Sequence, residues 1–258
     1  MPPVTTEALI LRCYPYSESS RILRLLTPGL GLRSAIAKGA RRPKSHFAGL
    51  LEPFTEGSAT LYLKEGRDLQ TLAAFDLLRA RQELGRDLVG FAGASLISEL
   101  VLRAGTEEPH PALYREVTST LDRVSGAGLG ARAGPVLAGV WRVVSLLGFE
   151  PVTDRCTGCK RWLEPDEEAR FDARAGGVAC ESCRPAGKAL APELRAELRA
   201  MTAGEHAAGS PFPREHVALL QSFLRAQIEP EREFRSLELL ERWTRAASAA
   251  GNRQGQGT

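Results

Sequence analysis

The first 78 residues alternate apolar and polar side chains in short runs separated by turn-forming residues. This alternation predicts strands, because successive side chains of a strand point to opposite faces. The five runs are TEALILRCY, SRILRLLT, LRSAIAKG, EGSATLYLKEG and DLQTLAAFDLL. Pro28, Gly29 and Gly31 mark a hairpin turn between the second and third runs. We therefore expect a small closed barrel, in which closure removes the exposed strand edges.

From residue 79 onward, apolar positions recur every three or four residues, which is typical of helices. The segment 134–149 is apolar almost all round, which predicts a buried central helix. Further helical patterns lie at 86–105, 111–124, 191–201, 213–229 and 235–247. The pattern predicts an α+β multidomain chain with a barrel over 1–78 and a mainly helical domain over 79–245. The small, polar and Gly-rich stretch 246–258 is expected to be a disordered tail.

The segment 150–187 contains two cysteine pairs, Cys156 with Cys159 in CTGC and Cys180 with Cys183 in CESC. Two intervening residues let both sulfurs of a tight turn point to one side, as a tetrahedral Zn²⁺ site requires. The spacing predicts one structural zinc per chain, in a module inserted in the helical domain. A hairpin with Phe171 and Val178 is expected between the pairs. The alternative is four buried or redox-active cysteines.

Positive charge is concentrated at the front of the chain. The first 50 residues hold eight basic and two acidic residues, although the whole chain has a net charge of only +3. The densest stretch is KGARRPK, at residues 38–44. This distribution predicts a polyanion partner for the barrel, and the alternative is a solvated basic face. The candidate DNA-binding residues are Lys38, Gly39, Arg41, Arg42, Lys44, Arg12, Arg21, Arg24 and Arg33.

The sequence contains no convincing set of catalytic residues, so we expect a protein that is not an enzyme. Nucleotide-binding glycine loops and a zinc-deaminase signature are missing, and the four histidines are expected at surface or helix-cap positions. A zinc-finger DNA glycosylase with Pro2 as nucleophile is a remote alternative, because Pro3 follows where those enzymes have glutamate. We find no signal peptide or membrane span, so the expected location is the cytoplasm.

With this order of elements, the chain resembles the RecO family of bacterial recombination mediators. The stretches KGARRPKS and LLEPF and the two cysteine pairs carry the resemblance most specifically. It implies an N-terminal OB-fold that binds single- and double-stranded DNA and anneals complementary strands in the nucleoid. It also implies partnership with RecR, contact with the C-terminal tail of the single-stranded-DNA-binding protein, and loading of RecA. A zinc-bearing adaptor that binds an acidic protein through the barrel is the alternative.

Two finer expectations concern these ligands. The acidic C-terminal tail of the single-stranded-DNA-binding protein would need an apolar pocket with a basic rim in the helical domain. The predicted rim residues are Arg132, Arg142 and Arg225. For stacking of bases on the barrel, the aromatic candidates are Tyr14, Tyr16, Phe47, Phe54 and Tyr62.

Overall fold

The computed structural model describes residues 2–185, 187–205, 210, 213–228 and 233–243. The tail predicted over 246–258 lies outside the described residues. The chain divides into two compact units: Met1–Gln82 with Leu100–Ser125, and Glu83–Glu99 with Gly126–Thr258. Helix α1 (Leu88–Ala104) therefore contributes residues to both units.

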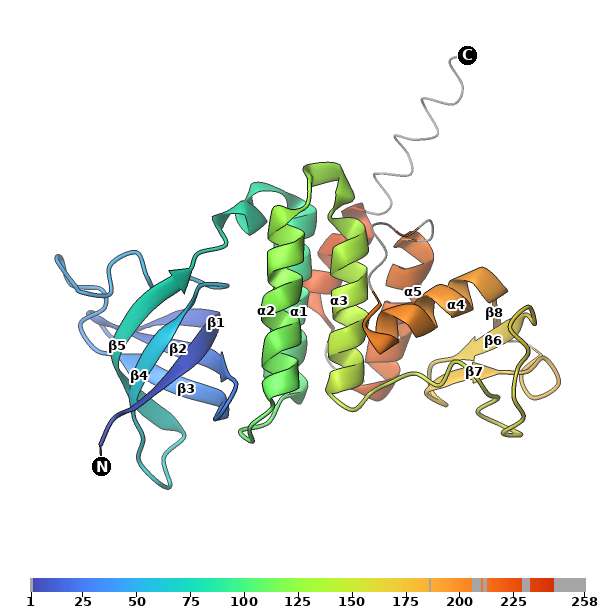
Figure 1. Cartoon of the computed structure of the whole chain (residues 1–258), viewed down its shortest axis with the longest axis horizontal. Helices are drawn as coiled ribbons and strands as arrows, with labels where there is room; N and C mark the ends of the chain where they lie inside the picture. Colours follow the sequence, from blue (N-terminus) through green and yellow to red (C-terminus); the bar gives the residue numbers. More distant parts are fainter. Residues whose placement is uncertain (1, 186, 206–209, 211–212, 229–232, 244–258) are drawn as a thin grey trace, which may run out of the picture. The chain divides into compact units, whose positions relative to one another are not determined.

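The five strands of the first unit close into a barrel, as the alternating pattern predicts (Figure 1). They are β1 (Val4–Tyr16), β2 (Ser20–Thr27), β3 (Gly31–Ala37), β4 (Glu56–Tyr62) and β5 (Leu69–Arg79). Their order around the barrel is β1-β2-β3-β5-β4, in which β3 and β5 run parallel and the other neighbours run antiparallel. Five strands in this arrangement form an OB-fold. Its interior is apolar and includes Ala8, Ile10, Leu23, Leu25, Ala35, Leu61, Leu72 and Phe75.

Strand β1 extends further than the sequence pattern predicts. The run TEALILRCY ends at Tyr14, but the ladder with β2 continues until Tyr16 lies opposite Ser20. Ser17 in the remaining turn has a left-handed φ of 54°. The longer ladder gives Tyr14 and Tyr16 the rigid backbone of a paired strand.

A buried arginine joins the barrel to α2 (Pro111–Gly126) within the first unit. The side chain of Arg81 is only 1% exposed, and it lies 2.5 Å from a carboxylate oxygen of Glu56 and 2.7 Å from one of Asp122 on α2. Its Nη1 donates to the Phe54 carbonyl oxygen over 3.1 Å. A guanidinium with two carboxylates and backbone acceptors is well compensated inside a protein. The barrel and α2 are therefore held together by a buried ion network.

The turn between β2 and β3 also contacts the segment before α2. Gly31 has φ of +66°, and a Cβ there would lie 2.2 Å from the Glu108 carbonyl oxygen. The amide of Leu32 donates to the Thr106 carbonyl oxygen over 2.9 Å. Glycine is required at this position because both the positive φ and the close backbone approach exclude a side chain.

The second unit is mainly helical, and α3 (Ala133–Leu146) lies at its centre, which confirms the predicted buried helix. Helices α4 (Pro192–Ala203) and α5 (Pro213–Gln227) both contact α3 (Figure 1). Residues 235–243 are also helical. Short 3₁₀ turns occur at Gln82–Arg86 and Leu129–Ala131. Among the residues that the structure describes, no helix is both long and apolar enough to cross a membrane.

The apolar stripe of α1 is only partly covered. The periodicity over 86–105 places Leu88, Phe91, Leu96 and Leu100 on one stripe. Leu96 and Leu100 are buried, whereas Leu88 and Phe91 are 47% and 46% exposed. The exposed pair lies in the first turns of the helix, so the buried face begins later than the periodicity indicates.

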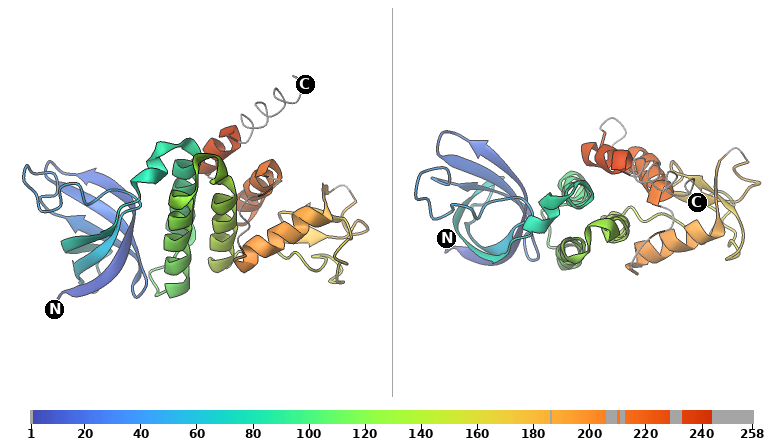
Figure 2. Two further views of the ribbon diagram at one scale, coloured as in Figure 1. Left: turned by 45° about the horizontal axis from the view of Figure 1, so that its top comes forward. Right: turned by 90° about the horizontal axis from the view of Figure 1, so that it is seen from above.

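The cysteine segment forms a small sheet beside α4 and α5 (Figures 1 and 2). Strands β6 (Ala169–Asp172) and β7 (Gly177–Ala179) pair with Phe171 opposite Val178, which confirms the predicted hairpin. Strand β8 (Lys188–Leu190) adds to the other edge of β6. The sheet thus runs past the predicted boundary at residue 187. A three-residue strand is too short to show a period in the sequence.

Aromatic side chains join this sheet to the helices of the same unit. The ring of Phe171 lies 6.1 Å from that of Phe223 on α5, and Phe223 lies 5.8 Å from Trp141 on α3. The Gln227 side chain donates to the Ala173 carbonyl oxygen over 2.7 Å. Folding of the cysteine segment therefore completes part of the helical core.

His216 is a core residue, so the expectation of a surface or cap position was wrong for it. Its side chain is fully buried. Its Nδ1 accepts a hydrogen bond of 3.2 Å from the Trp141 indole, and its Nε2 lies 3.3 Å from a Glu197 carboxylate oxygen. Three helices thus meet at one buried polar cluster. His110 confirms the cap expectation, since its Nδ1 accepts from the Leu113 amide over 3.1 Å.

The buried His216 should make stability depend on pH. Burial lowers the pKa of His216 below its ordinary value, and the Glu197 carboxylate opposes part of this effect. The unfolded chain therefore binds the proton more readily, and stability is expected to fall as pH drops below about 6.5. Urea unfolding of the wild type and of His216→Gln between pH 5 and 8 measures this. The variant should lose part of the pH slope, and an unchanged slope would contradict the assignment.

Candidate nucleic-acid interface and metal centre

Residues 38–44, here called the basic turn, follow β3 directly. Its four cationic side chains, Lys38, Arg41, Arg42 and Lys44, are all exposed. Gly39 has φ of +73°, and its carbonyl oxygen accepts from the Arg42 amide over 3.0 Å. The turn closes on itself through this bond. Four positive charges are thereby presented on a short, internally bonded segment.

The basic turn is bonded to the turn between β1 and β2. The Arg41 amide donates to the Ser19 carbonyl oxygen over 2.9 Å, and Arg41 Nη1 donates to the Ser17 carbonyl oxygen over 2.8 Å. Tyr14 and Tyr16, on the strand that leads into this turn, are 39% and 51% exposed. Cationic and aromatic side chains therefore share one end of the barrel. Such a combination suits the phosphates and bases of single strands.

Three other aromatic candidates do not join this surface. Phe47 and Phe54 are 3% and 8% exposed, so both are core residues. Tyr62 is exposed, but its neighbour Leu61 pairs with Val4, at the opposite end of β1. The structure thus keeps two of the five predicted stacking residues beside the basic turn.

Arg12 and Arg24 are neighbours on the outer face of the barrel. They lie opposite each other in the β1–β2 ladder, and opposed residues project to the same side. Arg12 is exposed, with its guanidinium 5.3 Å from the ring centre of Tyr14. Arg24 is half-buried. Arg12 therefore adds charge next to an exposed tyrosine.

Arg21 and Arg33 already have carboxylate partners. Arg21 Nη1 donates to Glu52 and to the Leu51 carbonyl oxygen, both over 3.1 Å. Arg33 lies 3.0 Å from a Glu107 carboxylate oxygen. Their charges are partly compensated, so they add less to the attraction of a polyanion than the basic turn does.

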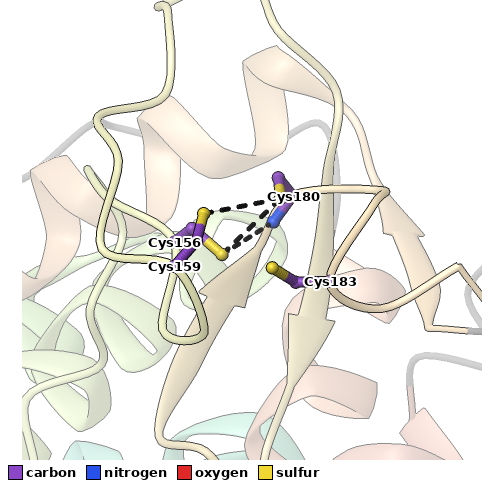
Figure 3. A group of neighbouring side chains, drawn as sticks. All are labelled: Cys156, Cys159, Cys180 and Cys183. Carbon is purple, nitrogen blue, oxygen red and sulfur yellow. Dashed lines mark hydrogen bonds between the residues drawn. The ribbon is translucent and has the colours of Figure 1, made fainter.

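The four cysteines of the second unit form one cluster, in which all sulfurs lie within 4.8 Å of one another. Figure 3 shows them converging from two turns of the chain. Cys156 Sγ lies 3.7 Å from Cys180 Sγ, and Cys159 Sγ lies 3.9 Å from the same atom. A tetrahedral site with Zn–S bonds of about 2.3 Å separates its sulfurs by about 3.8 Å. The four sulfurs are therefore close enough together to hold one metal ion.

The backbone around the cluster favours thiolates. The amides of Gly158 and Cys180 each donate to Cys156 Sγ over 3.3 Å. Although burial opposes ionisation, the hydrogen bonds that Cys156 accepts lower its pKa to about 6. Interactions with the other three sulfurs, of which that with Cys180 is the strongest, raise the pKa of Cys183 to about 12. Four negative sulfurs are therefore unfavourable together without a bound cation.

Arg161 and Arg184, two arginines near the cluster, have carboxylate partners inside the module. Arg161 forms a two-pronged ion pair with Glu167, which raises the pKa of the guanidinium and lowers that of the carboxyl group. Arg184 lies 2.9 Å from an Asp172 oxygen. These ion pairs brace the loops that carry the cysteines.

The three arginines predicted at a partner pocket occupy different environments. Arg132 is 3% exposed and forms a buried ion pair with Asp87, so it does not form an exposed rim. A sequence shows its charge but not the carboxylate that compensates it. Arg142 is half-buried and donates to the Thr202 carbonyl oxygen over 2.7 Å. Arg225 is exposed, 3.7 Å from Glu233.

Comparison with known proteins gives matches along most of the chain. Residues 1–81 match the family model "Recombination protein O N terminal", and residues 85–238 match "Recombination protein O C terminal". The DNA repair protein RecO of Rhodopirellula baltica is 37% identical over 69% of this chain and 66% of its own length. That of an Anaeromyxobacter species is 37% identical over 71% and 72%. That of a Nocardioides species is 30% identical over 92% and 98%.

Proposed function

Because the chain belongs to the RecO family of DNA repair proteins, we propose that it is a non-enzymatic recombination mediator. In this proposal it binds single- and double-stranded DNA and anneals complementary strands in the bacterial nucleoid. With RecR, it loads RecA onto single strands coated by the single-stranded-DNA-binding protein.

The observation that carries the proposal is the joint position of the basic turn, Arg12, Tyr14 and Tyr16 at one end of an OB-fold barrel. Phosphate contacts by arginine and lysine supply affinity without reading sequence, and tyrosine faces accept any base. A surface of this kind suits a protein that acts at any DNA sequence. Binding of an acidic protein would explain the positive charges, but it would not explain why two tyrosines are exposed beside them.

For the cysteine cluster we propose one structural Zn²⁺ per chain, bound by all four sulfurs. The sulfur separations fit Zn–S bonds, and thiolates are preferred ligands of this ion. Four protein ligands complete the coordination sphere, so the ion supplies folding energy rather than an open catalytic position.

Partner contacts in this proposal follow the family resemblance. The acidic tail of the single-stranded-DNA-binding protein and RecR are the expected protein partners. Of the three predicted rim arginines, Arg142 and Arg225 stay available for the tail, because both keep exposed surface.

The double variant Arg41→Ala/Arg42→Ala tests the DNA assignment. Affinity should fall about equally for unrelated sequences, because phosphates carry no base information. Two lost contacts should flatten the log–log salt dependence for single strands by about 1.4, at roughly 0.7 for each contact. Fluorescence anisotropy with labelled oligonucleotides at several salt concentrations measures both quantities, and strand annealing should decline in parallel.

A matched control removes the same charge elsewhere. Arg199 and Arg214 are exposed on α4 and α5 of the second unit. Arg199→Ala/Arg214→Ala should leave the salt slope at the wild-type value. If both double variants bind DNA as the wild type does while an acidic protein partner is lost only from the first, the basic turn serves a protein instead.

A further inference from the structure

Trp162 is the most conspicuous exposed apolar residue of the cysteine module. Its side chain is 67% exposed, the largest fraction among the exposed large hydrophobic residues of the described chain. The next residue, Leu163, is buried at 8%. Successive residues of an extended segment face opposite sides, so Leu163 belongs to the small core and Trp162 to the surface. Packing within the module therefore does not explain why a tryptophan stands at position 162.

The backbone pairs Trp162 with an exposed arginine, Arg155. The segment 154–163 is a narrow hairpin around the first cysteine pair, in which Arg155 bridges Trp162 in antiparallel fashion. The flanking bonds run from the Cys156 amide to the Arg161 carbonyl oxygen over 2.8 Å and from the Leu163 amide to the Asp154 carbonyl oxygen over 3.0 Å. Arg155 and Trp162 thus form a pair without mutual hydrogen bonds, in which side chains on one face approach most closely.

The hairpin segment 154–163 that carries the indole has a net positive charge. Between Arg155 and Leu163 the chain holds Arg155, Lys160 and Arg161 and no acidic residue. All three cations are exposed. Arg161 is paired with Glu167, and Lys160 Nζ donates to the Thr157 carbonyl oxygen over 2.7 Å. Compensation of a negatively charged thiolate cluster accounts for cations here, but it does not account for an exposed tryptophan beside them.

We propose that the tip of this hairpin is a second binding site for single-stranded nucleic acid, in which a base stacks on Trp162 and Arg155 and Lys160 contact the flanking phosphates. The site deepens the proposed DNA-binding function and rests on it. An unpaired strand is the favoured ligand because its base faces are free to stack, whereas a duplex hides them between neighbouring base pairs. Stacking on one aromatic face reads no sequence, so this site tolerates any base.

The first test compares Trp162→Ala with Trp162→Phe in the full-length, metal-bound protein. Oligo(dT) affinity should fall about tenfold for alanine, within the range expected for one base–aromatic stack, and stay near the wild-type value for phenylalanine. Double-stranded affinity should change less than twofold in both variants. Metal content and circular dichroism confirm that each variant is folded. Equal oligo(dT) affinity for all three proteins would overturn the proposal.

A second measurement uses the intrinsic fluorescence of the tryptophans. The chain has three tryptophans, of which Trp141 is fully buried. Saturating oligo(dT) should quench the tryptophan emission of the wild type. It should also reduce the further quenching of this emission by iodide, because the bound strand covers Trp162. The same titration of Trp162→Phe should show little quenching. Quenching that persists in this variant would place the contact elsewhere.

A charge-matched pair separates the phosphate contact from general attraction. Arg155→Ala should flatten the salt dependence by about 0.7 in log–log slope. Arg174→Ala removes an exposed arginine from the β6–β7 turn of the same module and should leave the slope unchanged. Failure here, with the basic-turn variant still defective, would refute this site and preserve the proposed function. If the Trp162→Ala and Arg155→Ala variants bind oligo(dT) normally but no longer bind RecR or another protein, the hairpin tip is a protein-binding site instead.

Discussion

Cys159→Ser is expected to abolish stoichiometric metal binding and to unfold the cysteine module, while the barrel stays folded. Structural zinc sites supply about 10–16 kcal/mol of apparent binding free energy in small peptides. A whole domain is stable by only about 5–15 kcal/mol, so the loss of even part of this term is decisive. Cys159 Sγ contacts Cys180 Sγ, and removal of one ligand leaves three thiolates that cannot complete a tetrahedral site.

The damage should spread into the helices of the second unit. Phe171 of the module contacts Phe223, which contacts Trp141 in the central helix. Hydrogen exchange should therefore rise across residues 150–190 and, to a smaller extent, along α5. Mass spectrometry of the native protein reports the metal, with one Zn²⁺ per chain expected in the wild type.

Cys13→Ser is the matched control for this prediction. Cys13 is partly buried against the barrel core and lies outside the cluster. Its replacement should leave the metal stoichiometry unchanged. Wild-type protein without bound metal, or a Cys159→Ser variant with full metal content, would contradict the assignment.

Arg81→Ala is expected to destabilise the first unit by about 3–5 kcal/mol, the usual effect of removing one partner of a buried ion pair. The loss would leave the Glu56 and Asp122 carboxylates facing each other without the cation that joins them. Burial, with Glu56 next to its hydroxyl, already raises the pKa of Tyr114, so added negative charge is poorly tolerated there. Urea unfolding and hydrogen exchange along α2 measure the effect.

Arg79→Ala provides the comparison. Arg79 pairs with the same Asp122, but its side chain is 56% exposed. Solvent screens such a pair, so its removal should change stability by less than about 1 kcal/mol. Equal effects of the two substitutions would mean that the Arg81 network does not hold α2 to the barrel.

Several features followed from local patterns in the sequence. The period-two alternation located all five barrel strands, and the nearly all-apolar run at 134–149 located the central helix. The two C-x-x-C pairs located the four-cysteine cluster, since ligand spacing within a tight turn is a local property. The basic turn was visible because charge density along a chain needs no partner to be recognised.

Other features depended on contacts between distant residues. Arg33, Arg41 and Arg132 are alike in the sequence, yet Arg41 is exposed, Arg33 is paired with Glu107 and Arg132 is buried with Asp87. In the same way His216 became a core residue because Trp141, 75 positions away, donates to it.

The sequence by itself therefore determined which segments are strands, helices and the two turns of the cysteine cluster, because periodicity, turn chemistry and ligand spacing act over a few residues. Only the tertiary structure decided that α2 joins the barrel through Arg81, that β8 completes the sheet of the cysteine module, and which charged residues remain for ligands. The physical reason is that desolvation and ion pairing depend on which side chains meet in space. Those contacts depend on how whole helices and strands pack together, which composition and local sequence patterns do not predict directly.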